Sequence, residues 1–284
     1  MTMQAWSPDP GGANYSVKSI IPTSANKDQH LRHNTRKSNM KNFLKSIAAG
    51  PRIILVTGHF GSGKTEFSVS LAFALAALRD EGVADLSSLA LCDLDLENPY
   101  FRSRELTEEM ESIGIRVYSD PYHGRNGSEL QTLDPAILAP VQNPDCHVIM
   151  DTGGNNTGAM ILNQFRKHFG GEYRMLYVVN KNRPGTDTVE KNLEEIKAIE
   201  ATTGLTVTGL VSNSHFIRET TAEDVKEGYA FACEVGVKSG LPVLCACCSA
   251  EIARELEEDD TADASMEIFP IGLYMRQTYL DKKV

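Results

Sequence analysis

Long apolar runs, a basic surface and a disulfide pattern are all missing from this chain. No stretch reaches the ~18 consecutive apolar residues that a membrane-spanning helix needs. The longest apolar segment, Phe67 to Leu78, contains serines and follows a glycine-rich turn, which is typical of a buried helix. The net charge of -10 argues against a protein whose whole surface tracks nucleic acid. The six cysteines show no regular pairing pattern and no secretion signal is recognisable, which favours a reduced, cytoplasmic protein.

Residues 1–50 differ in composition from the rest of the chain. Ser, Asn, Pro, Gly and basic residues are common, whereas apolar residues are sparse and aperiodic, so we predict a mostly disordered basic extension. Six Lys or Arg and one acid lie within residues 27–45. This part can touch nucleic acid, an acidic membrane or an acidic protein, although a solvated tail is the simpler interpretation. Its acid-poor start also resembles a transit peptide, but the amphipathic pattern is missing.

Residues 51–284 are predicted to form one α/β nucleotide-binding domain. Short β-branched runs alternate with helical patterns, which predicts a doubly wound, mostly parallel sheet of about seven strands. The expected strands are Ile53–Thr57, Leu89–Asp93, Ile115–Tyr118, Val148–Asp151, Met175–Asn180, Val207–Ser212 and Pro242–Cys245. Helices are expected over 67–78, ending at Gly82, and over 104–113, 158–168, 186–201 and 221–238. Near the C-terminus, "MEIFPIGLYM" predicts one more strand or a packed tail.

The stretch "ILVTGHFGSGKTEF", residues 54–67, predicts a phosphate-binding loop. It matches G-x-x-x-x-G-K-[ST] at every fixed position, and it lies between an expected strand and an expected helix. Glycines allow the backbone to aim successive N–H groups at an anion, and the helix start adds a positive dipole end. Lys64 supplies a charge for the terminal phosphates, and the Thr65 hydroxyl suits Mg²⁺. The expected nucleotide contacts are Gly58, His59, Phe60, Gly61, Ser62, Gly63, Lys64, Thr65 and Glu66.

Carboxylates follow two of the expected strands. In "LALCDLDLENPY", Asp93 and Asp95 project to the same side because they are two residues apart on an extended chain. In "HVIMDTGG", Asp151 ends a strand and Gly154 follows, as in a D-x-x-G switch. Carboxylates at this edge of an open α/β sheet can hold Mg²⁺, and a glycine N–H there can sense a γ-phosphate. The expected metal site consists of Thr65, Asp93 and Asp151.

Together these motifs resemble the MinD/ParA class of P-loop ATPases, which is grouped with the CobQ/CobB nucleotide-binding domains. The resemblance covers roughly residues 52–244, and "GHFGSGKTEF", "DLDLENPYFRSRE" and "YVVNKNRP" look like a little-characterised bacterial branch of ATP-binding proteins. It implies bound ATP and Mg²⁺, and slow hydrolysis coupled to a change of shape or partner. Carried over by motif, Lys64, Asp95 and Asp93 would be catalytic. Asp95 would position the attacking water with the support of Asp93, and Asp151 would hold the Mg²⁺ shell.

The resemblance also suggests which residues read the base. In that class an asparagine at a late strand end does so, which indicates Asn213 in "GLVSN", with Asn180 as the other candidate. Both asparagines can equally be turn formers. The segment "NKNR" at 180–183 begins like the guanine motif N-K-x-D but carries Arg183 in place of the aspartate, which favours adenine.

His59 departs from the family pattern. MinD/ParA proteins carry a lysine there that reaches across a dimer to the partner's nucleotide, and a neutral imidazole does not replace a permanent cation. This argues against an ATP-sandwich homodimer and leaves His59 to cap the loop or to face solvent. Arg102 or Arg104 can supply the missing charge, unless they are ordinary surface arginines.

We therefore expect a magnesium-dependent ATPase that acts as a nucleotide-controlled switch for an unidentified protein partner. One alternative is a ligase or small-molecule kinase of the CobB or dethiobiotin-synthetase type, and another is an adaptor that senses nucleotide without hydrolysing it. Nickel-insertion ATPases of the same class carry a C-x-C site, which raises a metal hypothesis for Cys245, Cys247 and Cys248. Because no ligand at zinc spacing stands nearby, small buried cysteines are the favoured interpretation.

Overall fold

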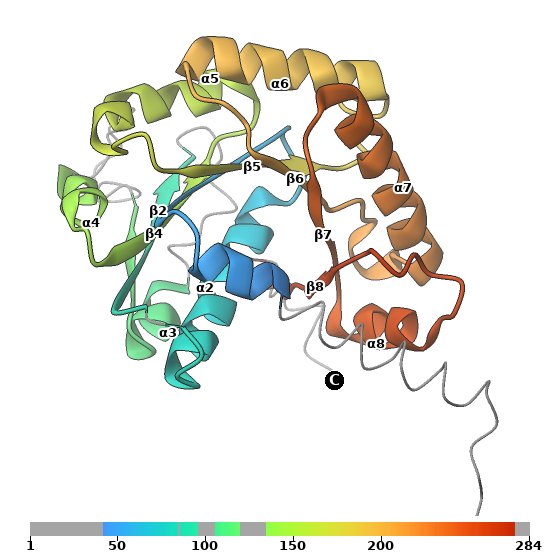
Figure 1. Cartoon of the computed structure of the whole chain (residues 1–284), viewed down its shortest axis with the longest axis horizontal. Coiled ribbons are helices and arrows are strands. Elements are labelled where there is room, and N and C mark those ends of the chain that lie inside the picture. Colours follow the sequence, from blue (N-terminus) through green and yellow to red (C-terminus); the bar gives the residue numbers. More distant parts are fainter. Residues whose placement is uncertain (1–41, 85, 96–105, 120–134, 276–284) are drawn as a thin grey trace, which may run out of the picture.

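The computed structural model describes residues 42–84, 86–95, 106–119 and 135–275, and within these residues eight strands form one sheet (Figure 1). The strand order is β3-β2-β4-β1-β5-β6-β7-β8, and every neighbouring pair is parallel. The α/β expectation is therefore confirmed, with an additional strand and without an antiparallel pair. Since β4 and β5 flank β1, the crevice at the carboxyl end of β1 is the topological switch point, where open sheets bind ligands.

The strands lie where the sequence predicts them, with small differences at their ends. They are β1 (Ile53–Thr57), β2 (Ser88–Leu94), β3 (Ile115–Tyr118), β4 (Cys146–Thr152), β5 (Arg174–Val179), β6 (Gly209–Ser212), β7 (Val243–Cys248) and β8 (Ile268–Pro270). The eighth strand lies in the segment "MEIFPIGLYM", for which the sequence predicted either a strand or a packed tail. It pairs with β7 because Ile268 and Phe269 add to the buried apolar surface beside it.

Most of the expected helices are present. They are α2 (Lys64–Asp80), α3 (Thr107–Ser112), α4 (Leu138–Gln142), α5 (Asn155–Ala159), α6 (Val189–Thr203), α7 (Ala222–Ser239) and α8 (Ala250–Glu258). The expectation of one helix over 158–168 is wrong, because α5 is followed by separate 3₁₀ turns at Met160–Gln164 and Arg166–His168. The side chain of Asn155 accepts a hydrogen bond from the Gly158 N–H at 2.9 Å, so the helix begins earlier.

The folded body begins before Pro51. Residues 42–48, which we assigned to the extension, form a helix. Phe43 and Ile47 are one helical turn apart, and both are buried in the core. The Phe43 ring centroid lies 6.5 Å from that of Phe67 and 5.4 Å from that of Phe269. The basic residues of 27–41 and the arginines at 102 and 104 lie outside the described residues.

Apolar side chains cover both faces of the sheet. Alternate residues of β1 point to opposite faces, so Ile54 and Val56 pack with α2 while Ile53 and Leu55 pack in the cluster that includes α6. In Figure 1, α2 and α3 lie on one side of the sheet, and α5 and α6 lie on the other. Across the described ranges, every helix is too short or too polar to cross a membrane. The polar side chains of interest gather at the carboxyl edge of the strands.

Candidate functional site

The loop between β1 and α2 has the geometry of a phosphate cradle. Gly58, Gly61 and Gly63 have φ values of 138°, 74° and 87°, a region that glycine tolerates and other residues rarely adopt. A Cβ at Gly58 would lie 2.7 Å from the Val178 carbonyl oxygen, so there is no room for a side chain. The first turn of α2 has no side-chain cap, which leaves its N–H groups able to bind an anion.

Lys64 lies folded back on this loop. Its side chain is buried, with the residue only 6% exposed, and Nζ donates a hydrogen bond to the His59 carbonyl oxygen at 3.1 Å. Burial lowers the pKa of Lys64, and nearby carboxylates oppose that shift. They are those of Asp151, Asp95 and Glu195. The ammonium group is therefore held in place by acids and by one loop carbonyl that a phosphate oxygen can replace.

Asp151 is the most deeply buried carboxylate of the site. It is the penultimate residue of β4, opposite Asp93 of β2, and Ser68 Oγ donates to its Oδ1 at 3.1 Å. Burial raises the pKa of Asp151 to about 6, against the opposing effects of the Thr65 hydroxyl and the Lys64 charge. Its Oδ2 is buried, and among the described residues no hydrogen-bond donor satisfies it. A carboxylate oxygen in that state fits Mg²⁺.

Asp93 and Asp95 lie beside Asp151, but only one of them lines the pocket. The Asp95 N–H donates to Asp93 Oδ1 at 3.1 Å, which fixes the turn at the end of β2. Asp95 lines the pocket in front of the loop, whereas Asp93 does not. In the described part of the chain, no three Asp, Glu, His or Cys side chains are placed to hold a metal ion by themselves. Such a site would need phosphate oxygens or water to complete the coordination.

The D-x-x-G segment packs directly on the phosphate loop. A Cβ at Gly154 would lie 2.6 Å from the Cα of Phe60 and 2.7 Å from its nitrogen. The Asn155 N–H points to the Gly58 carbonyl oxygen at 3.4 Å, and Thr152 Oγ1 donates to the Val56 carbonyl oxygen at 2.9 Å. Because the contact is between backbones, only glycine fits at position 154.

His59 is held by a helix of its own chain. Nδ1 lies 3.1 Å from Oε1 of Glu195 on α6, and the Tyr177 hydroxyl donates to Oε2 of the same glutamate at 2.9 Å. The imidazole also packs against Gly185, and the side chain remains 31% exposed. His59 therefore neither caps the loop nor simply faces solvent. The sequence did not indicate Glu195, which is one of several glutamates on α6.

The two candidate asparagines take different positions. Asn213 Nδ2 donates to the Ser62 carbonyl oxygen at 2.8 Å, and the residue lines the pocket. Asn180 is fully buried, and its Oδ1 accepts a hydrogen bond from the Asn182 N–H at 3.0 Å, as a turn former does. Asn213 thus braces the loop and faces the pocket, while Asn180 shapes the turn after β5.

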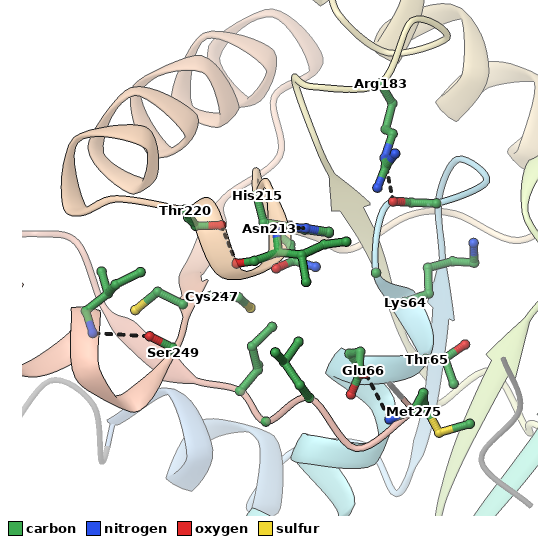
Figure 2. A pocket seen from close by; sticks show the side chains of 18 of the residues that line it. Lys64, Thr65, Glu66, Arg183, Asn213, His215, Thr220, Cys247, Ser249 and Met275 are labelled. Atoms are coloured by element: carbon green, nitrogen blue, oxygen red, sulfur yellow. Dashed lines mark hydrogen bonds between the residues drawn. The ribbon is translucent and has the colours of Figure 1, made fainter. Parts of the chain in front are cut away.

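Arg183 reaches the same loop from the other side. Its Nε donates to the Gly61 carbonyl oxygen at 2.7 Å, and the guanidinium lines the pocket, as Figure 2 shows. In the sequence, Arg183 served only as evidence against guanine, because it stands where the N-K-x-D motif has an aspartate. The signal that could have placed it here is a permanent cation in the turn that follows β5.

A pocket of ≈ 230 Å³ extends from the phosphate loop along the carboxyl ends of β6 and β7 (Figure 2). Its far end is mostly apolar and includes Cys247, Cys248 and Ile252. Ile217, which also lines it, has a φ of 61°, an unusual value for a β-branched residue and a mark of local strain. All of the cysteines are free thiols, and Cys245, Cys247 and Cys248 are buried, as the favoured interpretation expects.

The remaining loop residues are distributed around this pocket. Phe60 stands at its rim and is 62% exposed, whereas Ser62 is fully buried beneath the loop. Thr65 lines the pocket beside Asp151. The Glu66 carboxylate accepts hydrogen bonds from backbone N–H groups near the C-terminus, so it does not point at the cradle.

No protein-family model and no curated protein matches this chain. Solved structures with similar folds include the cell division protein FtsY of Thermotoga maritima, with 19% identity, a TM-score of 0.41, and coverage of 78% of this chain and 75% of that one. FtsY of Elizabethkingia anophelis has 18% identity and a TM-score of 0.39, covering 78% and 73%. Chloroplast FtsY of Physcomitrella patens has 16% identity and a TM-score of 0.43, covering 79% and 68%. At these values the function has to be argued from this chain's own residues.

Proposed function

We propose that this protein binds ATP with Mg²⁺, hydrolyses it slowly and acts as a nucleotide-controlled switch. The observation that carries the proposal is the placement of Lys64, which lies buried between the uncapped start of α2 and the carboxylates of Asp95 and Asp151. A cation and a positive helix end on one side, with acids on the other, suit a triphosphate bound together with a divalent cation. The narrower assignment to the MinD/ParA class rests on the sequence motifs.

Each residue has a definite task in this proposal. Lys64 exchanges its hydrogen bond to the His59 carbonyl for the terminal phosphate oxygens. Thr65 and Asp151 fit Mg²⁺, which when bound neutralises charge on the phosphates. Asp95 faces the pocket and orients the attacking water, while Asp93 fixes the Asp95 backbone. Catalysis of this type depends mainly on positioning and charge stabilisation.

The lining of the pocket supports adenine over guanine. Guanine offers an amino group that a carboxylate recognises, whereas adenine offers N6 to neutral acceptors. Among the described residues that line the pocket, the carboxylates are those of Glu66 and Asp95. Glu66 is engaged by the C-terminal backbone, and Asp95 lies at the phosphate end. Asn213 remains as the amide that faces the pocket near the loop.

Phosphate release and calorimetry test the proposal. Wild type and Lys64→Ala are compared with ATP and with GTP, at several protein concentrations and with Mg²⁺. We expect release from ATP in preference to GTP, and its loss in Lys64→Ala. Binding of Mg-ATP without any phosphate release would indicate an adaptor, and the absence of adenine nucleotide binding by calorimetry would refute the proposal. A rate per molecule that rises with protein concentration would indicate a dimeric switch.

A further inference from the structure

The C-terminal strap, residues 271–275, runs from β8 along the edge of the pocket. The Ile271 N–H donates to the Cys248 carbonyl oxygen at 2.8 Å, which continues the pairing with β7. Ile271, Gly272, Leu273 and Met275 all line the pocket. The strap is therefore part of the wall that faces Ile217 and Thr220 of the loop after β6.

The strap is fastened to the helix that follows the phosphate loop. The Tyr274 and Met275 N–H groups donate to the two carboxylate oxygens of Glu66, each at 2.9 Å, and Figure 2 shows one of these bonds beside Thr65. The Gly272 N–H donates to Ser70 Oγ at 3.1 Å, one helical turn further along α2. Hydrogen bonds to a charged acceptor are stronger than neutral ones, so Glu66 is the main attachment.

Ring packing adds a second attachment. The Tyr274 ring stacks on Phe73 of α2 with centroids 4.8 Å apart. A Cβ at Gly272 would collide with the Tyr274 ring, so glycine is needed for the strap to pass beneath it. Leu273, between these fixed points, lines the pocket and is 40% exposed, so it is not part of the buried core.

From this arrangement we propose that the C-terminal strap holds the heterocyclic base of the nucleotide, and that Glu66 positions the strap. The inference rests on the proposed function and assigns the nucleoside part of the same ligand. Ile271, Leu273 and Met275 give this wall of the pocket an apolar surface, and a flat heterocycle can pack against such a surface. Because Glu66 is two residues after Lys64, one short segment fixes both the phosphate end and the base end of the site.

Inorganic tripolyphosphate separates the two ends, because it carries the phosphate chain without a base. We expect Glu66→Ala to weaken Mg-ATP binding about tenfold or more, while binding of magnesium tripolyphosphate stays within about twofold of wild type. Glu81→Ala, at the opposite end of α2, removes an exposed carboxylate and is expected to leave both affinities unchanged. Leu273→Ala, an exposed position that does not threaten the fold, is expected to weaken ATP binding alone.

Equal losses of ATP and tripolyphosphate in Glu66→Ala would place Glu66 in the phosphate site and overturn the inference. Unchanged ATP binding in both Glu66→Ala and Leu273→Ala would overturn it as well. Failure of the proposed function looks different, because then wild type would bind neither ligand or Lys64→Ala would bind tripolyphosphate as well as wild type does.

Discussion

Nδ1 of His59 lies 3.1 Å from Oε1 of Glu195, so the first side chain of the phosphate loop is tied to α6 of the same chain. In the family that the sequence resembles, this position carries a lysine that reaches across a dimer. Here the imidazole contacts α6 of its own chain, and Arg183 brings a permanent cation to the loop from the turn after β5. Both observations favour a phosphate site whose charged groups come from one chain.

Glu195 is expected to matter for nucleotide binding although it does not line the pocket. Replacing it with alanine removes the carboxylate that contacts both His59 and Tyr177, and leaves the loop less firmly held. We expect Glu195→Ala to raise the dissociation constant for Mg-ATP by about tenfold, which corresponds to about 1.4 kcal/mol. Glu194→Ala is the matched control, since Glu194 is the exposed neighbour on α6. Equal affinities for the two variants would show that the pair does not support the loop.

Arg183 is expected to act on turnover more than on binding. A guanidinium that lines the pocket beside Gly61 can stabilise charge that develops on the transferred phosphoryl group. We expect Arg183→Ala to lower kcat by about tenfold or more with a smaller change in KM. Arg254→Ala on α8, where the residue is exposed, serves as the control. Normal kcat in Arg183→Ala would exclude the arginine from catalysis.

The fold and the centre of the site could be predicted because local sequence determines them. Strand-end residues of a parallel sheet meet at one edge, which is why Lys64, Asp95 and Asp151 come together although they are far apart in the chain. The glycine spacing of the loop likewise predicts its positive φ values. The roles of these residues in binding and hydrolysis stay predictions.

What the sequence could not provide depends on how separate elements pack. Glu194 and Glu195 are identical neighbours, and only the rotation of α6 against the sheet decides which of them meets His59. Glu66 was expected to contact the nucleotide, but its carboxylate accepts hydrogen bonds from a segment about two hundred positions away in the sequence. The sequence did not predict the helix over 42–48, because its apolar pattern, Phe43 and Ile47, is short. Packing against α2 and β8 stabilises this helix more than its own helix propensity does.

Gly154→Ala tests the contact between the D-x-x-G segment and the phosphate loop. The new Cβ would lie 2.6 Å from the Phe60 Cα, and backbone cannot yield as a flexible side chain does, so the loop has to shift. We expect nucleotide binding to weaken by about tenfold or more while the circular dichroism spectrum stays that of wild type. Binding of Mg-ATP at wild-type affinity would mean that the loop tolerates the displacement and that this contact does not shape the cradle.

Asp151→Asn tests the electrostatic state of the metal site through stability. A carboxyl group whose pKa rises from 3.8 to about 6 on folding binds more protons in the folded state over that interval, so its contribution to the free energy of unfolding decreases as pH rises. The asparagine variant lacks this term. As the pH rises from 4 to 7, the free energy of unfolding of the variant should therefore increase by about 2 kcal/mol relative to that of wild type. Urea denaturation with a chelator present measures this difference. Asp145→Asn, which removes an exposed carboxylate just before β4, serves as the matched control. If the free energy of unfolding of Asp151→Asn instead changed with pH as that of wild type does, burial would not raise the pKa of Asp151 in the folded protein.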